Sequence, residues 1–312
     1  MKKTKKFCCF LLNGFLFCFF AATFFAFFSK FSFLADICSQ FRVQYFLFAF
    51  IALIVFYLAK STKELVYMAF VSFLINAFCI LNCLKLPDFV NHYDTSVGVV
   101  NLLTSNKNYE KVRSELLDKD VDILVILEID DIWSSKLHDV KSNYDFTYEL
   151  SREDNFGIAL YSKIPIKSLQ KVNAGTLDVP IISAVCDFDG HEVEILGVHT
   201  TPPMSSEYFK NSSKMLENIA EYVKNSERDV IIAGDFNTTF FSNNYKNFLK
   251  VSDLKDGSSI LKGSWSAHHL PCMRISLDHI FIPKNYKFKK FELGKNIGSD
   301  HFPVFAEISF EN

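Results

Sequence analysis

The sequence of 312 residues lacks the motifs of several common enzyme classes. It has no GxSxG motif, which argues against a hydrolase that places a serine nucleophile on a strand-to-helix turn. It has no CxxC pair and no Cys/His spacing of a zinc site. A strong charge of one sign is also missing, because 33 basic residues nearly balance 35 acidic ones. Zinc-site and serine-hydrolase chemistry are therefore not expected.

Charged residues are absent from three long apolar runs near the N-terminus, at residues 7–28, 43–59 and 65–84. About 20 apolar helical residues cross a bilayer, so the outer runs are long enough and the middle run is at the short limit. A signal peptide fits the first run poorly, because that run is long and no convincing cleavage site follows it. We therefore predict that residues 1–93 form a membrane anchor with three transmembrane helices.

Basic residues are distributed unevenly around the predicted spans. One side has Lys2, Lys3, Lys5, Lys6, Lys60 and Lys63, and the other has Lys30, Arg42 and Lys85. The side richer in Lys and Arg is normally cytoplasmic. The sequence predicts a multi-pass protein of the cell (inner) membrane, with the lipid bilayer as a partner. Its N-terminus should be cytoplasmic and its C-terminal domain extracytoplasmic.

Three asparagines, Asn13, Asn76 and Asn82, lie within the apolar runs. No acid or base accompanies them in these runs, so an ion pathway is not indicated. We expect them to form hydrogen bonds between helices.

The remaining residues, 94–312, carry 32 acidic and 24 basic side chains, a formal charge of minus eight. Short apolar runs typical of strands recur at 97–103, 121–127, 157–161, 181–186, 193–198, 230–233, 279–282 and 304–308. Apolar residues have helical spacing over 109–116 and 209–223. Many strands and few helices predict one domain of packed sheets with helices outside.

Polar residues that bind hard cations or move protons cluster where these apolar runs begin or end. They are Asn101, Glu128, His199, Asp235, Asn237, Asp278, Asp300 and His301. A single acid at a strand end is usually a cap or a solvated turn residue. So many residues of these types are difficult to explain as caps, and they indicate an active site.

The segments around these residues also resemble a known family. They read Gly98-Val-Val-Asn101, Leu127-Glu-Ile-Asp130, Val198-His-Thr-Thr-Pro-Pro203, Gly234-Asp-Phe-Asn-Thr238, Ser276-Leu-Asp-His-Ile280 and Gly298-Ser-Asp-His-Phe-Pro303. In this order they resemble the motifs of the endonuclease/exonuclease/phosphatase superfamily. The resemblance implies an α/β fold of two packed mixed β-sheets flanked by helices, a four-layer sandwich, over residues 94–312.

The resemblance also implies a metal site. It makes Glu128 the principal ligand, with Asn101 beside it and Asp300 completing the site. Carboxylate and amide oxygens suit Mg²⁺, and Mn²⁺ is the alternative.

The proton chemistry follows from the same comparison of motifs. The resemblance places Asp235 and Asn237 at the attacking water or the leaving group, and it pairs Asp278 with His301. It makes His199 a contact to the phosphate or the leaving group. A carboxylate that orients an imidazole favours its charged form, so His301 could either take a proton or hold the phosphate.

These features predict a membrane-anchored, Mg²⁺-dependent phosphoesterase that hydrolyses a phosphodiester. Its substrate partner could be a lipid head group, a nucleotide or a nucleic acid, because the fold does not determine the substrate. A nuclease is the alternative, although an acidic domain disfavours tight binding to long DNA. A non-catalytic membrane binding module is the alternative from another class. It would be marked by loss of a metal ligand or of the catalytic histidine, and neither is missing.

Overall fold

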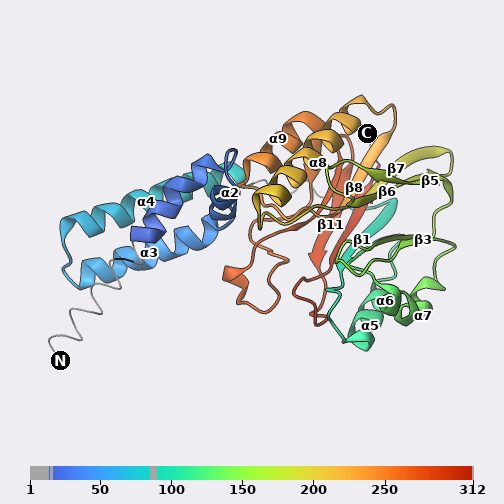
Figure 1. Cartoon of the computed structure of the whole chain (residues 1–312), viewed down its shortest axis with the longest axis horizontal. Coiled ribbons are helices and arrows are strands. Elements are labelled where there is room, and N and C mark those ends of the chain that lie inside the picture. Colours follow the sequence, from blue (N-terminus) through green and yellow to red (C-terminus); the bar gives the residue numbers. More distant parts are fainter. Residues whose placement is uncertain (1–13, 15–16, 85–89, 311–312) are drawn as a thin grey trace. The chain divides into compact units, whose positions relative to one another are not determined.

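The computed structural model describes residues 14, 17–84 and 90–310. The chain forms two compact units (Figure 1). The first comprises Met1–Leu84 with Phe240–Asn243, and we call it the helical unit. The second comprises Lys85–Thr239 with Asn244–Asn312, and we call it the sheet unit.

The helical unit contains a helical segment over Phe17–Phe28, which ends in η1 (Ala26–Phe28), followed by α2 (Phe33–Gln40), α3 (Arg42–Leu58) and α4 (Lys63–Cys83). Among the described residues, α4 alone is long and apolar enough to cross a membrane by itself. A second span is possible if Phe17–Phe28 and α2, which are bent by 113° relative to each other, count as one.

The predicted set of three transmembrane helices is not confirmed. The middle run forms α3, whose 17 residues are at the short limit for a full crossing. The described part of the first run, Phe17–Phe28, is helical up to the predicted end of the span, and α2 follows it after a bend of 113°. Residues 7–13, 15 and 16 of that run lie outside the described part of the chain.

A polar cluster is buried within the helical unit. Arg42 Nη1 donates to the Thr23 carbonyl at 2.8 Å and to Asn76 Oδ1 at 3.2 Å. Asn76 Nδ2 in turn donates to the Ser72 carbonyl at 2.8 Å. The expected role of Asn76 between helices is therefore observed, but a base does accompany it, because Arg42 reaches it from another helix. Asn82 is exposed, and Asn13 lies outside the described residues.

The sheet unit consists of two six-stranded mixed sheets. The first has the order β11-β12-β1-β2-β4-β3 and the second has β5-β6-β7-β8-β10-β9. The strands are β1 (Thr95–Asn101), β2 (Ile123–Leu127), β3 (Phe146–Leu150), β4 (Ile158–Ser162), β5 (Ile166–Asn173), β6 (Pro180–Phe188), β7 (His191–His199), β8 (Asp229–Asp235), β9 (Leu254–Asp256), β10 (Asp278–Pro283), β11 (Lys287–Leu293) and β12 (Val304–Ser309). Among the strands of the described residues, β1 with β2 and β7 with β8 pair in parallel, and the other pairs are antiparallel.

Helices cover the outer face of each sheet (Figure 1). On the first sheet these are α5 (Tyr109–Lys119), α6 (Asp131–Lys136) and α7 (His138–Lys141), and on the second they are α8 (Ser206–Asn225) and α9 (Asn243–Ser252). A short 3-10 helix, η2 (Pro271–Met273), lies in the loop before β10. The prediction of two packed mixed sheets flanked by helices is confirmed.

Alternation along the strands directs side chains to the two faces of each sheet. Val97 and Val99 of β1 lie in the core between the sheets, together with Ile231 and Ala233 of β8. The residues between them face the helices. Two residues further along each strand, the same inward-facing position holds a polar residue. This residue is Asn101 at the end of β1 and Asp235 at the end of β8.

The turn between β6 and β7 shows how local sequence specifies a hairpin. Asp189 and Gly190 have φ values of 54° and 95°, as two-residue hairpin turns require. The amide of Gly190 also donates to Asp187 Oδ1 at 2.7 Å.

Candidate active site

Three acid and imidazole side chains form a row across neighbouring strands. His199 at the end of β7 pairs with Asp235 at the end of β8, and Asp235 pairs with Asp278 at the start of β10. All three are buried. Because cross-strand partners on one face lie side by side, strand register alone brings these residues together.

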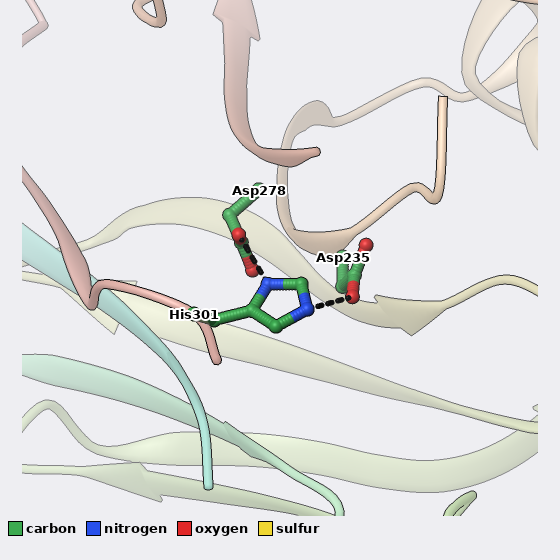
Figure 2. Close-up of side chains that lie close together, drawn as sticks. All are labelled: Asp235, Asp278 and His301. Atoms are coloured by element: carbon green, nitrogen blue, oxygen red, sulfur yellow. Dashed lines mark hydrogen bonds and ion pairs between the residues drawn. The ribbon is translucent and has the colours of Figure 1, made fainter. Parts of the chain in front are cut away.

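His301 completes this row from the loop before β12 (Figure 2). Its Nδ1 is 2.8 Å from Asp278 Oδ2, and its Nε2 is 3.6 Å from Asp235 Oδ2. The loop is held by its own side chains, since the His301 amide donates to Ser299 Oγ at 3.1 Å. The imidazole therefore lies between two carboxylates that would otherwise repel each other.

Burial and charge oppose each other at His301. Burial lowers the pKa of the imidazole, but Asp278 and Asp235 together outweigh burial and raise the pKa to about 10. Burial raises the pKa of Asp235 to about 7, against the lowering effect of His301. At neutral pH, His301 is thus a cation, and Asp235 is close to its titration midpoint.

His199 has the opposite electrostatic state. Burial, followed by the positive charge of His301, lowers the pKa of His199 to about 4. Its Nε2 is 3.8 Å from Asp235 Oδ2, and its buried Nδ1 has no hydrogen-bond partner among the described residues. The neutral ring therefore has one buried polar atom that no described side chain or backbone group satisfies.

The loop after β8 carries Asn237. Its backbone φ is 47°, a left-handed conformation that Asn tolerates better than most residues. Its amide donates to Asp235 Oδ1 at 2.8 Å, and its side-chain Nδ2 donates to the Thr200 carbonyl at 2.8 Å. Asn237 is therefore held close to Asp235.

A second group lies at the ends of β1 and β2. Glu128 directly follows Leu127, an inward-facing residue, so strand alternation would turn Glu128 outward. Its φ of 58° breaks the alternation and re-aims the carboxylate. Asn101 Nδ2 lies 3.1 Å from Glu128 Oε1 and 3.2 Å from Asp235 Oδ2, and thus links the two groups.

The amide oxygen of Asn101 accepts from the Leu103 amide at 3.0 Å. In this arrangement Asn101 orients two carboxylates through its NH₂ group, and its role as a metal ligand stays a prediction. Thr104, which the sequence analysis did not identify, donates from its amide to Glu128 Oε2 at 3.2 Å. Its hydroxyl also donates to the Glu128 carbonyl at 3.3 Å, and no motif of the sequence analysis included this residue.

Asp300 is the third predicted ligand. Trp265 Nε1 donates to its Oδ2 at 3.0 Å, whereas its Oδ1 is buried without a hydrogen-bond partner among the described residues. Burial, and to a smaller extent the charge of Asp300, raise the pKa of Glu128. Two neighbouring carboxylates, one with an unpaired oxygen, fit a divalent cation.

Asp235, Asp278 and His301 also satisfy a geometric test for metal ligands, since one ligand atom from each lies within 4.8 Å of the others. In this group, however, His301 Nδ1 is already hydrogen-bonded to Asp278 and its ring is charged. We therefore interpret the trio as an acid-base unit. Two residues near the site support its loops. Trp265 orients Asp300, and the Arg274 guanidinium packs over the Phe302 ring, 4.4 Å from the ring centroid.

Comparison with known proteins is decisive for the family. The profile of the Endonuclease/Exonuclease/phosphatase family matches residues 90–301. The chain belongs to this family. A search of the curated proteins finds no match.

Solved structures of the same fold resemble the sheet unit of this family member. One is a humanized D. rerio TDP2, with 16% identity and a TM-score of 0.59 over 69% of this chain and 98% of the other. A family protein from Leptotrichia buccalis has 19% identity and a TM-score of 0.58 over 69% and 100% of the two chains. D. rerio TDP2 complexed with a single-strand DNA product has 15% identity and a TM-score of 0.58 over 69% and 98%.

Family membership and fold together support a phosphoester hydrolase in general. Enzymes of this family commonly use divalent metals, and the buried Asp-Asp-His group lies at the centre of the site.

Proposed function

We propose that this protein is a membrane-anchored, divalent-metal-dependent phosphodiesterase. The observation that carries the proposal is the row of His199, Asp235 and Asp278 completed by His301, beside the carboxylates of Glu128 and Asp300. Such a site combines a base, a charged donor and cation ligands, which are the parts that phosphoester hydrolysis needs.

The electrostatics support a division of roles within the row. Asp235, with its pKa raised to about 7, is suited to accept the proton of an attacking water. His301 is held in its charged form by Asp278 and donates from Nε2 to a phosphate oxygen. His199 contributes its neutral ring and unpaired Nδ1 to the phosphate or the leaving group.

The residues that would hold the metal are Glu128 and Asp300, with Mg²⁺ as the expected ion and Mn²⁺ as a substitute. When bound, the ion neutralises charge on the phosphate oxygens. Asn101 and Thr104 hold the Glu128 carboxylate, and Trp265 holds that of Asp300. Both carboxylates are therefore pre-oriented before any ion binds.

Apolar surface in the helical unit supports membrane anchoring. Large side chains of α3 and α4 are exposed, among them Ile51, Tyr67 and Phe78. Exposed apolar patches of this kind are rare on water-soluble surfaces. These patches favour a bilayer location, and the six-to-three asymmetry of basic residues, counted for three crossings, favours a sheet unit outside the cytoplasm.

Cysteine labelling tests this orientation. Cys272 of the sheet unit is exposed, and Cys186 is buried. A membrane-impermeant maleimide should label intact cells that carry the protein, and Cys272→Ser should remove that signal. Labelling of Cys272 only after lysis would place the sheet unit in the cytoplasm.

A nuclease is the second candidate function. Its support is the similar fold of D. rerio TDP2, a protein whose structure contains a single-strand DNA product. The formal charge of minus eight over residues 94–312 argues against long duplex substrates, so a short or single-stranded nucleic acid would be the substrate.

A substrate panel on the full chain in detergent micelles tests the proposed function. We expect Mg²⁺-dependent turnover of bis-p-nitrophenyl phosphate and of at least one lipid phosphodiester. The Asp235→Asn protein, purified identically, controls for contaminating enzymes. Faster turnover of single-stranded DNA than of any lipid would favour the nuclease, and no turnover of any phosphoester would refute both functions.

A further inference from the structure

Behind the candidate active site, on the helix-covered face of the second sheet, lies another imidazole-carboxylate pair. His279 and Asp256 are both fully buried, and their Nδ1 and Oδ2 atoms are 2.7 Å apart. His279 follows Asp278 in β10, so strand alternation directs it away from the row that contains Asp278. None of the roles proposed above uses this pair.

The carboxylate of Asp256 is held by several donors. Tyr245 donates its hydroxyl to Oδ2 at 2.6 Å, and Ser258 donates its hydroxyl to Oδ2 at 2.7 Å and its amide to Oδ1 at 2.8 Å. A buried carboxylate with this many donors is fixed in position. It therefore provides a rigid support for the His279 ring.

The other ring nitrogen of His279 reaches the active-site loop. Nε2 lies 3.0 Å from the carbonyl oxygen of Thr238. A carbonyl only accepts hydrogen bonds, so Nε2 must carry the proton that makes this contact. The ring thus connects the fixed carboxylate of Asp256 to the backbone just after Asn237.

This contact completes a set of bonds to the loop carbonyls. Thr200 donates its amide to the Asp235 carbonyl at 2.9 Å and its hydroxyl to the Phe236 carbonyl at 2.6 Å. These two bonds hold the start of the loop, and the bond from His279 holds its end at Thr238. Asn237, with its left-handed backbone, lies between the two attachments.

We propose that His279, supported by Asp256, is a positioning residue that fixes the loop from Asp235 to Thr238 for phosphoester hydrolysis. It contacts neither the substrate nor the reacting atoms. This inference rests on the proposed function, since the role is defined by the geometry of Asp235 and Asn237 during the reaction.

If His279 and Asp256 only stabilised the fold, substituting them should have the same effect on activity as substituting another buried polar group on the same face of the sheet. Glu194 of β7 provides that comparison: it is 2% exposed and accepts from Ser183 Oγ at 2.6 Å and from the Tyr222 hydroxyl at 2.7 Å. Within the described part of the chain, its hydrogen bonds go to Ser183 and Tyr222 and not to the loop from Asp235 to Thr238. Glu194→Gln is therefore the matched control for Asp256→Asn.

The experiment uses the full chain in detergent, with bis-p-nitrophenyl phosphate and Mg²⁺. His279→Leu and Asp256→Asn should lower kcat by at least about 10-fold while KM changes by less than about 2-fold, because misplaced groups slow the chemical step. His279→Gln, which keeps an N–H donor for Thr238, should recover part of the kcat lost in His279→Leu. Glu194→Gln should keep the wild-type kcat.

Hydrogen exchange of the backbone amides over residues 236–239 gives a second readout that is independent of activity. Exchange should be faster than wild type in His279→Leu and Asp256→Asn, and unchanged in Glu194→Gln. If wild type is inactive but this pattern appears, the loop contact stands and the proposed function fails. If wild type is active, the positioning role is overturned by an unchanged kcat in His279→Leu, or by an equal loss in Glu194→Gln.

Discussion

Two buried polar clusters, one in each unit, differ in how far they are satisfied. In the helical unit, Arg42, Asn76, Thr23 and Ser72 bond to one another, and none of them has a buried polar side-chain atom without a partner. In the sheet unit, buried atoms of His199, Asp278 and Asp300 have no hydrogen-bond partner among the described residues.

The difference indicates what each cluster is for. A buried polar group without a partner costs about 1–3 kcal/mol, and three such groups next to one another, at His199, Asp278 and Asp300, could be satisfied together by a bound ion or ligand. A closed network needs no ligand and holds helices in register. The helical cluster is therefore interpreted as structural, and the row at the ends of the strands is interpreted as a site for substrate and metal.

Of the changes that test this difference between the clusters, removal of divalent metal should have the largest effect on activity. EDTA should abolish turnover of a phosphodiester, and added Mg²⁺ or Mn²⁺ should restore it, because the Glu128 and Asp300 carboxylates are the proposed oxygen ligands of the cation. Glu128→Gln should require more Mg²⁺ for half-maximal rate and turn over more slowly. An unchanged Mg²⁺ titration in Glu128→Gln would remove this residue from the metal site.

Loss of the acid-base groups should have the next largest effect. His301→Ala and Asp235→Asn should each lower kcat by at least about 100-fold, the scale of a lost acid or base. Circular dichroism must first show that each variant is folded. Activity within about 3-fold of wild type in either folded variant would contradict the assigned roles.

The pH profile tests the link between Asp278 and His301. If activity needs ionised Asp235 and charged His301, the rate should rise as pH passes about 7 and fall as pH passes about 10. Asp278→Asn removes a negative charge that raises the His301 pKa, so the alkaline fall should move to lower pH.

The same variant also tests whether the two residues act together. In a His301→Ala background, Asp278→Asn should add little further loss, since residues that act as a unit are not additive. An unmoved alkaline limb, or losses that simply multiply, would separate Asp278 from His301.

The smallest effect on activity is expected in the helical cluster. Asn76→Leu removes an acceptor of Arg42 and should lower the stability of the full chain in detergent by about 1–3 kcal/mol, seen as a lower thermal midpoint. Its kcat should match that of wild type. Asn82→Leu, at an exposed position, is the control and should change neither. A large loss of kcat in Asn76→Leu would mean that the helical cluster also serves the reaction.

Much of the sheet unit could be predicted from the sequence. The apolar runs became β1, β2, β4, β6, β7, β8, β10 and β12, because continuous Val and Ile stretches fill a core between two sheets. The strands that were missed, β3, β5, β9 and β11, are the edge strands of the two sheets. Their half-exposed, polar-rich sequences carry little of the apolar signal that marks a buried strand.

The sequence by itself determined which polar residues lie at the ends of strands, because the order of motifs and the alternation of apolar residues can be read from short segments of the chain. The tertiary structure alone decided their contacts. Strand register aligned His199, Asp235 and Asp278, a left-handed backbone re-aimed Glu128, and folding brought Arg42 to Asn76 across 34 positions of sequence. These contacts depend on how segments that are distant in the sequence pair in space. The spacing of residues along the chain does not specify that pairing.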